Sequence, residues 1–328
     1  EVSFAMTDTT ELSIGARWYD IAVDFEGSAN SSFYNGFGNP DTQQFGSNLS
    51  AQYAPGNANG YPDKAETDGV IGKVTYSWKP SEDKMYYVTW SEGFRPGLLN
   101  RPVGRTSADG SYSVPPSVDS DEITNMEFGW KNVLQDGRLR FNGSIFRVDV
   151  SGLQSTIFDP SIVNLFFSDN AADAEIKGVE GDFIYYTEGG LILSGAFSLL
   201  DTEITKSLIP TGDIVVGQDL AFAPGFQANL SGRKEWTMEG GNTGFWQLQF
   251  SMSDKSYSDI MQPNRAKQDS YNLTNLRAGI STDDWTAEMY VDNLTDERAE
   301  ISNTFVFDRQ RVAVVRPMTV GLRYKMKF

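Results

Sequence analysis

Apolar and polar residues alternate along the end of the chain. The apolar set is Val320, Leu322, Tyr324, Met326 and Phe328, and a glycine, an arginine and two lysines stand between its members. Side chains of a β-strand point alternately to its two faces, so this segment predicts a strand with one apolar and one cationic face.

The same alternation returns along the whole chain and predicts about thirteen strands. Clear examples are residues 70–78, 126–131, 191–199, 246–252 and 285–291. Turns of about two to seven residues alternate with long connections of about 17 to more than 40 residues. Short turns on one side and long loops on the other are typical of an antiparallel transmembrane β-barrel, and a soluble β-sandwich has no reason for this asymmetry.

The alternation also predicts which side chains meet lipid and which face the lumen. The residues expected to point outward are Trp78, Trp130, Phe183, Phe197, Leu248, Met289 and Tyr324. Those expected to point inward are Lys73, Glu127, Glu180, Arg277, Glu288 and Arg323. A register error of one residue would exchange the two faces within a strand, so the prediction is specific.

The number and direction of the strands predict that the barrel is larger than this chain. If the short turns are periplasmic, both the first and the thirteenth strand run toward the periplasm. A bacterial single-chain barrel has an even number of strands, so we expect an odd number of further strands before Glu1.

Composition is compatible with a barrel and excludes several other classes of protein and of functional site. Hydrophobic residues make up 39% of the 328 residues and aromatic residues 13%, with no apolar run long enough for a membrane-spanning helix. Neither cysteine nor histidine occurs, which removes thiolate metal sites and any serine–histidine hydrolase arrangement. The net charge of −17 argues against nucleic acid as a partner. We therefore expect no enzyme and no cofactor.

Several motifs resemble the carboxyl-terminal half of TonB-dependent receptors. SEGFRPG at 91–97 is similar to a strand-to-loop segment of that family, MEFGWKN at 126–132 to its E-x-G-x-K strand, and GVE at 178–180 to a strand start. DNLTD at 292–296 and RPMTVG at 316–321 are similar to its closing pattern, although arginine and proline are exchanged. Each motif is weak alone, but their order and spacing extend over the whole chain.

The resemblance implies that residues 1–328 form the carboxyl-terminal part of a 22-stranded outer-membrane barrel. The plug domain, the TonB box and about nine strands would then lie upstream. It implies a receptor for TonB-energised uptake of a scarce nutrient, such as a siderophore, cobalamin or a carbohydrate. The implied partners are outer-membrane lipid and lipopolysaccharide, the TonB complex through the upstream part, the barrel-assembly machinery, and a small or oligomeric nutrient ligand.

Candidate ligand-binding residues lie in two predicted extracellular segments. Arg95, Asn100 and Arg101 stand where a strand enters a long loop. In a structural alternative, Gly93, Pro96 and Gly97 shape the backbone there, while Glu92 and Arg95 form an ion pair in the wall.

The second segment is the loop of residues 27–68, in which Phe33, Tyr34 and Phe37 stand among amides and glycines. Such residues suit a sugar or an aryl-bearing siderophore, and they equally suit a loop packed on its own aromatic rings.

The final strand resembles the signal by which the barrel-assembly machinery recognises its clients. The residues concerned are Tyr324, Met326 and Phe328. A purely lipid-facing role for the terminal aromatic residue is the alternative.

A passive pore or a surface-binding barrel is the alternative function, because long loops and a polar lumen serve either role. The sequence does not identify the substrate or an accessory partner.

Overall fold

The computed structural model describes the chain except residues 25–63, 101–105, 160–161, 163–165, 307–308 and 327–328. The predicted Phe33, Tyr34, Phe37, Arg101 and Phe328 lie outside the described residues. The prediction of about thirteen strands is confirmed, because the main sheet contains thirteen antiparallel strands.

Each strand of the main sheet pairs with its neighbours in the order of the sequence, apart from short strands inserted in the connections. The strands are β1 (Val2–Thr7), β2 (Thr10–Asp24), β3 (Lys64–Ser81), β4 (Lys84–Arg95), β7 (Asp121–Leu134), β8 (Leu139–Ile157), β9 (Phe167–Tyr186), β10 (Leu191–Ser207), β11 (Phe226–Thr237), β12 (Thr243–Ser253), β15 (Tyr271–Ser281), β16 (Trp285–Asp292) and β19 (Thr319–Met326).

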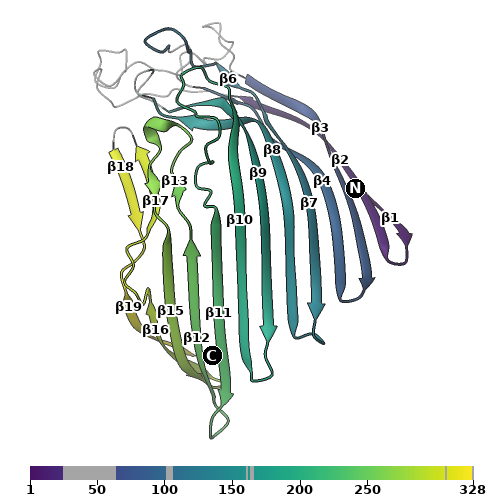
Figure 1. Ribbon diagram of the computed structural model, residues 1–328, viewed down its shortest axis with the longest axis vertical. Coiled ribbons are helices and arrows are strands. Elements are labelled where there is room, and N and C mark those ends of the chain that lie inside the picture. Colours follow the sequence, from purple (N-terminus) through teal and green to yellow (C-terminus); the bar gives the residue numbers. More distant parts are fainter. Residues whose placement is uncertain (25–63, 101–105, 160–161, 163–165, 307–308, 327–328) are drawn as a thin grey trace.

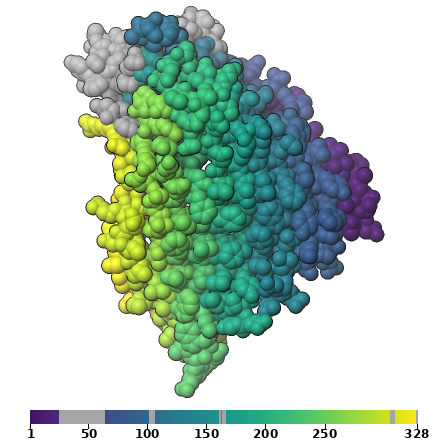
Figure 2. Space-filling view, viewed as in Figure 1, coloured from purple at the N-terminus to yellow at the C-terminus, as the bar shows by residue number. Residues whose placement is uncertain are grey.

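The sheet is a curved open wall, neither a closed barrel nor a pair of stacked sheets (Figure 1). The short turns lie at one end of the strands and the long connections at the other, as predicted. In the described part of the chain, β1 and β19 form the two margins, and each pairs on one side only. Figure 2 shows the strands packed side by side without a break across the visible face.

The connection between β8 and β9 is shorter than the predicted long connections of about 17 to more than 40 residues. Strands β8 and β9 are longer than the apolar alternation indicated, and residues 158–166 alone connect them. Beyond Ile145 and Val179, charged residues occupy the face that is apolar lower in the same strands. Arg147 donates to Glu175 at 2.6 Å across the two strands. Alternation of apolar residues marks the part of a strand that meets lipid, so it cannot show how far the strand continues above the membrane.

The predicted division of the side chains between two faces is confirmed by the register. Trp78 pairs with Tyr86, and Tyr86 pairs with Trp130, so these side chains share one face. Through the pairings of the following strands, the predicted outward residues of β9, β10, β12, β16 and β19 lie on this same face. The predicted inward residues fall on the opposite face by the same pairings.

The apolar face is the more exposed one. On β3, Tyr76 and Trp78 are 46% and 47% exposed, whereas Ser77 between them is 7% exposed. Side chains converge on the concave side of a curved sheet and diverge on its convex side, so the polar face lines the concavity. A soluble protein buries its apolar face, and this wall presents it outward as a membrane barrel does.

Polar contacts tie neighbouring strands together on the concave face. The Tyr87 hydroxyl donates to Glu127 at 2.5 Å, and Arg323 donates to Glu288 at 3.0 Å. These contacts satisfy polar groups that line the lumen.

The long connections carry short paired strands that the sequence analysis did not predict. They are β5 (Leu98–Leu99) with β6 (Ser117–Val118), β13 (Ser256–Tyr257) with β14 (Lys267–Gln268), and β17 (Glu300–Val306) with β18 (Arg309–Val314); a 3₁₀ turn, η3, covers Gln262–Asn264. Buried apolar residues, among them Val114, Ile157, Phe167, Ile204 and Ile260, pack together where these connections meet the strands. The connections described here are therefore folded against the wall.

Asn293 directly follows the end of β16. It adopts a left-handed backbone conformation with φ of 55°, which asparagine tolerates better than most residues. Its side chain accepts the backbone N–H of Glu297 at 2.9 Å and donates to the carbonyls of Glu297 and Arg316. This one amide fixes both ends of the connection that leads to β19.

A charged substitution distinguishes the two faces of β12. Leu248 lies on the convex face and Gln249 beside it on the concave face. We expect Leu248→Arg to destabilise the folded barrel by about 2–4 kcal/mol and Gln249→Arg to have little effect, because arginine at mid-membrane depth must be desolvated. Unfolding titrations of the parent receptor in lipid vesicles measure the difference. Equal losses in both variants would contradict the facing.

Candidate functional site

A cleft of about 490 Å³ opens on the concave face at the end of the wall that carries the long connections. Ile123, Val150 and Ile176 form its apolar wall, on β7, β8 and β9. The connections opposite contribute Phe222 and Ile260. The volume falls in the range usual for small-molecule sites, and a mostly apolar lining with few polar groups is typical of them.

The polar edge of the cleft is an ion pair between Arg95 at the end of β4 and Asp121 at the start of β7. The two residues face each other in the strand register, and the Asp121 side chain is 1% exposed. One carboxylate oxygen accepts the Arg95 backbone N–H at 3.0 Å, and the other accepts the guanidinium, with Nε at 2.7 Å. The guanidinium is half-exposed, so it remains accessible from the cleft.

Gln154 connects this pair to the neighbouring loop. Its backbone N–H donates to Asp121 at 3.2 Å, and its carbonyl accepts the Arg95 guanidinium at 3.0 Å. Its side-chain amide donates to the carbonyls of Pro96 and Asp119, at 3.0 and 2.8 Å. The ends of β4, β7 and β8 are therefore joined through one glutamine.

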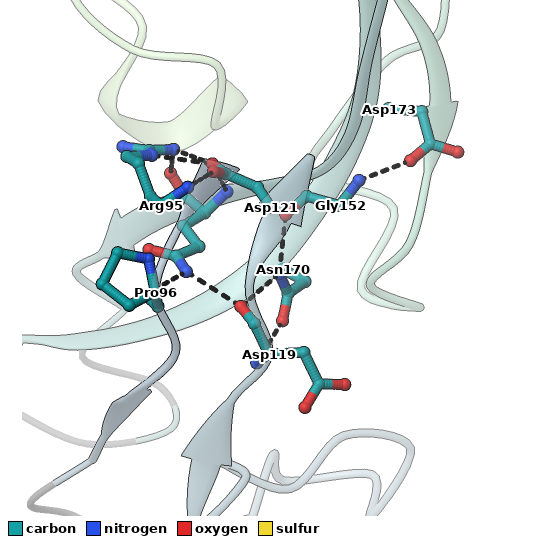
Figure 3. Close-up of polar contacts among 8 residues, drawn as sticks. Arg95, Pro96, Asp119, Asp121, Gly152, Asn170 and Asp173 are labelled. Carbon is teal, nitrogen blue, oxygen red and sulfur yellow. Dashed lines mark hydrogen bonds and ion pairs between the residues drawn. The ribbon is translucent and has the colours of Figure 1, made fainter. Parts of the chain in front are cut away.

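Asn170 on β9 extends the network (Figure 3). Its amide donates to the carbonyls of Asp119 and Gly152, and its carbonyl oxygen accepts the Asp119 N–H at 2.8 Å. Gly152 has φ of +65°, a conformation that favours glycine, and its N–H donates to Asp173 at 2.8 Å. We call Arg95, Asp121, Gln154 and Asn170 the rim network, because they fasten the strand ends around the cleft.

The predicted ion pair between Glu92 and Arg95 is wrong. Residues three apart on a strand point to opposite faces, so these two side chains cannot meet across the wall. Glu92 instead accepts the Gly72 N–H at 2.8 Å, and the partner of Arg95 is Asp121.

Asn100 is buried, at 3% exposure. Its amide donates to the carbonyls of Pro115 and Ser168, and its oxygen accepts the Ser168 N–H at 2.8 Å. These contacts join the β5–β6 pair to β9. Contact of Asn100 or Arg95 with a ligand stays a prediction.

Phe222 is the most unusual residue of the cleft. It has φ of +53°, which is rare for an aromatic residue, and its ring is half-exposed. Its N–H donates to the Tyr257 carbonyl at 2.7 Å, which holds the β10–β11 connection against the β12–β15 connection. Strained backbone conformations that persist in exposed loops often accompany binding sites.

Burial changes the acidity of two groups in the connections. Burial raises the pKa of Asp259, which lines the cleft, although hydrogen bonds from the Met261 and Ile260 backbone act in the opposite direction. Burial and a 2.6 Å hydrogen bond to Asp169 raise the pKa of Tyr112. The Asp259 carboxyl is therefore protonated more readily than an exposed aspartate, which reduces the negative charge of the cleft at low pH.

No cluster of three or more potential metal-ligating side chains occurs among the residues that the structure places. In the same part of the chain, no helix is long and apolar enough to cross a membrane.

Sequence reasoning missed Asp121, Gln154, Asn170 and Phe222. The first three are common polar residues whose partners depend on strand register and on the bulges of β8 near residues 150–154. Phe222 carries no sequence signal, because a left-handed phenylalanine is not expected from its neighbours.

The assembly-signal residues Tyr324 and Met326 lie on the convex face of β19 and are more than half exposed. Recognition of these residues by the assembly machinery stays a prediction.

Comparison with known proteins agrees with the fold. The family model "TonB dependent receptor-like, beta-barrel" matches residues 1–294. The ferric yersiniabactin uptake receptor FyuA of Yersinia pestis has a TM-score of 0.73 and 17% identity, over 99% of this chain and 44% of the receptor. The siderophore receptor PiuA of Acinetobacter baumannii has a TM-score of 0.66 and 16% identity, over 97% and 41%. The ferric-catecholate import receptor Fiu of E. coli K12 has a TM-score of 0.63 and 16% identity, over 99% and 43%.

The outward-facing apolar surface of the wall and its one-sided loops define an outer-membrane β-barrel. The chain belongs to the TonB-dependent receptor family. It spans less than half the length of the receptors named above.

Removal of Asp121 tests the rim network. We expect Asp121→Ala to destabilise the strand ends by about 1–3 kcal/mol, because the carboxylate accepts hydrogen bonds from Arg95 and Gln154 that nothing else replaces. Hydrogen exchange of the parent receptor measures the effect as faster exchange of residues 95–100 and 152–156.

Glu122→Ala is the matched control, because Glu122 is the next residue of β7 and is exposed. Similar protection in Asp121→Ala and wild type would show that the rim network does not hold these strand ends.

Proposed function

We propose that this chain is the carboxyl-terminal part of a receptor that imports a scarce nutrient across the outer membrane, with energy supplied through TonB. In this proposal residues 1–328 belong to one barrel domain, and a plug with about nine further strands lies upstream. The outer margins of β1 and β19 then pair with those strands, because unpaired backbone groups in lipid are costly. The observation that carries the proposal is the cleft on the lumen side of the outer mouth, in a chain of this family.

The lining of the cleft indicates the chemistry of the ligand. Apolar side chains from β7, β8 and β9 face Phe222 and Ile260, while one half-exposed guanidinium, that of Arg95, lies at the edge. A ligand with a flat apolar part and a negatively charged or carbonyl-rich part fits this arrangement. Siderophores have this composition, and the siderophore receptor PiuA is among the structural neighbours, which supports that class.

Uptake would begin with capture at the mouth. We propose that the predicted loop residues Phe33, Tyr34, Phe37 and Arg101 add aromatic and cationic contacts to the ligand, together with Arg95 and Asn100. The rim network holds the lower edge of the cleft rigid, so that little order has to be created when the ligand binds. A lumen as wide as that of a 22-stranded barrel is plugged, and opening a plugged lumen requires work. That work distinguishes energised uptake from the alternative of a passive pore.

Uptake by the parent receptor should require TonB and the proton motive force. We expect cells lacking TonB to bind ligand at the surface but to accumulate none, because the loops that bind are present while the plug stays closed. Uptake of a labelled ferric siderophore, compared in wild-type and TonB-deficient cells, measures this. Unchanged uptake without TonB would favour the passive pore.

Phe222→Gly tests the cleft independently of energy supply. We expect weaker ligand binding by about tenfold, since an aromatic contact is lost, together with an unchanged or higher stability, because glycine adopts φ of +53° without strain. Equilibrium binding to the purified parent receptor measures the affinity. Val216→Gly is the control, because Val216 is exposed in the same connection but does not line the cleft. Equal affinities of wild type and Phe222→Gly would place the ligand elsewhere.

A further inference from the structure

The charges around the cleft do not cancel. Among the described residues, the lining includes three charged side chains, those of Arg95, Asp121 and Asp259. Arg95 and Asp121 neutralise each other, because they form an ion pair. Asp259 is left over, in a chain whose net charge is −17. The described lining is therefore negative when the Asp259 carboxyl group is ionised, although a cation lies at the edge of the cleft.

The neighbours of Asp259 in the chain hold it at the wall of the cleft. Ser258, Ile260 and Met261 are buried, whereas Asp259 is partly exposed. Ile260 and Met261 belong to the apolar cluster that packs the connections against the strands, so this segment cannot move outward without exposing them. One carboxylate oxygen of Asp259 accepts the Met261 N–H at 2.9 Å, which orients the carboxylate.

Hydrogen bonds keep the turn around Asp259 closed. The Ser258 hydroxyl donates to the Asn264 carbonyl at 2.7 Å. The Arg265 guanidinium donates to the backbone carbonyl of Asp259 at 2.6 Å and lies over the Tyr257 ring, with Cζ 4.0 Å from the ring centroid. The backbone that carries the Asp259 carboxylate is therefore in place before a ligand arrives, so little order has to be created on binding.

The Asp259 carboxylate is poorly solvated. Burial raises the pKa of Asp259, and hydrogen bonds from the Met261 and Ile260 backbone, together with the charge of Arg265, offset this only in part. Burial disfavours the ionised form because water is displaced from it. A ligand group that carries a positive charge and donates hydrogen bonds would replace the lost solvation.

An aromatic ring belongs to the same part of the cleft. The Phe222 N–H donates to the Tyr257 carbonyl at 2.7 Å, which holds Phe222 beside the segment that carries Asp259. That segment follows β13, at the end of the wall with the long connections (Figure 1). The half-exposed Phe222 ring and the Asp259 side chain both line the cleft. A carboxylate and an aromatic ring each attract an ammonium group.

We propose that Asp259 and Phe222 form an ammonium-binding subsite of the cleft, and that the imported ligand carries a primary amine besides its carbonyl-rich part. The ammonium group donates to Asp259 and lies against the Phe222 ring, while oxygen atoms of the carbonyl-rich part accept from Arg95. This inference rests on the proposed uptake function and narrows its ligand class. A strongly anionic chelate, such as a ferric tricatecholate, is disfavoured because it meets an uncompensated carboxylate.

The test measures equilibrium binding of three ferric chelates to the purified full-length parent receptor. Ferrioxamine B is a linear ferric trihydroxamate that ends in a primary amine, and its N-acetylated form differs only at that amine. Ferric enterobactin is a tricatecholate and strongly anionic. We expect ferrioxamine B to bind about tenfold more tightly than its acetylated form, and the tricatecholate to bind most weakly.

The outcomes separate this inference from the uptake function. Equal binding of the two trihydroxamates, or tightest binding of the tricatecholate, would overturn the ammonium subsite and leave siderophore uptake standing. Binding of none of the three chelates would contradict the siderophore class proposed above, and the subsite with it. The comparison is made first on the wild-type receptor, so it does not depend on the folding of a variant.

Asp259→Asn then tests the carboxylate itself. The asparagine oxygen can still accept the Met261 N–H, so the turn is kept while the charge is lost, and the two trihydroxamates should bind equally. Asp254→Asn is the matched control, because Asp254 is an exposed carboxylate of the same connection that does not line the cleft. It should keep the wild-type preference, and an equal loss in both variants would show a general charge effect instead of a subsite.

Assembly of each variant is checked by heat-modifiable migration in gels. If Asp259→Asn does not assemble, Phe222→Leu is measured in its place, since leucine keeps an apolar side chain but has no aromatic ring to attract the ammonium group. The preference for the free amine should then decrease. A preference as large as that of the wild-type receptor would overturn the subsite.

Discussion

Every other feature of this protein depends on backbone pairing within one continuous sheet whose apolar face is turned outward. In lipid, each unpaired N–H or carbonyl group is costly, so the wall is formed from strands that pair with their sequence neighbours. Because side chains alternate, the same pairing that satisfies the backbone also separates a lipid face from a lumen face. The contrast between exposed Trp78 and buried Ser77 on β3 shows the result.

The wall positions the candidate site by bringing strand ends together. Arg95 and Asp121 are far apart in sequence but directly opposed in the β4–β7 register. Bulges near the outer end of β8 then orient Gln154 and Gly152 toward the neighbouring connections. The site is thus rigid along its strand side, while its other side is formed by connections that fold over the lumen.

The ion pair at the edge of the candidate site fixes the position of its cation. Arg95 is held by a buried carboxylate, so its remaining donors are directed and its charge is largely compensated. The site lies above the lipid-facing band, where the strands rise out of the membrane and charged pairs such as Arg147 with Glu175 replace the apolar face.

The period-two pattern alone determined the class of fold, the number of strands and the facing of each side chain. It did so because every membrane-spanning strand needs apolar side chains on its lipid face, and this requirement appears directly in the local sequence. The same pattern fails above the membrane: it missed the outer halves of β8 and β9, where no lipid face is needed. Motif order added the family. The partner of Arg95, the burial of Asn100, the strained Phe222 and the cleft between them were decided only by the tertiary structure. Each of these joins residues from different strands or connections, and their meeting depends on register, bulges and loop packing that local sequence does not specify.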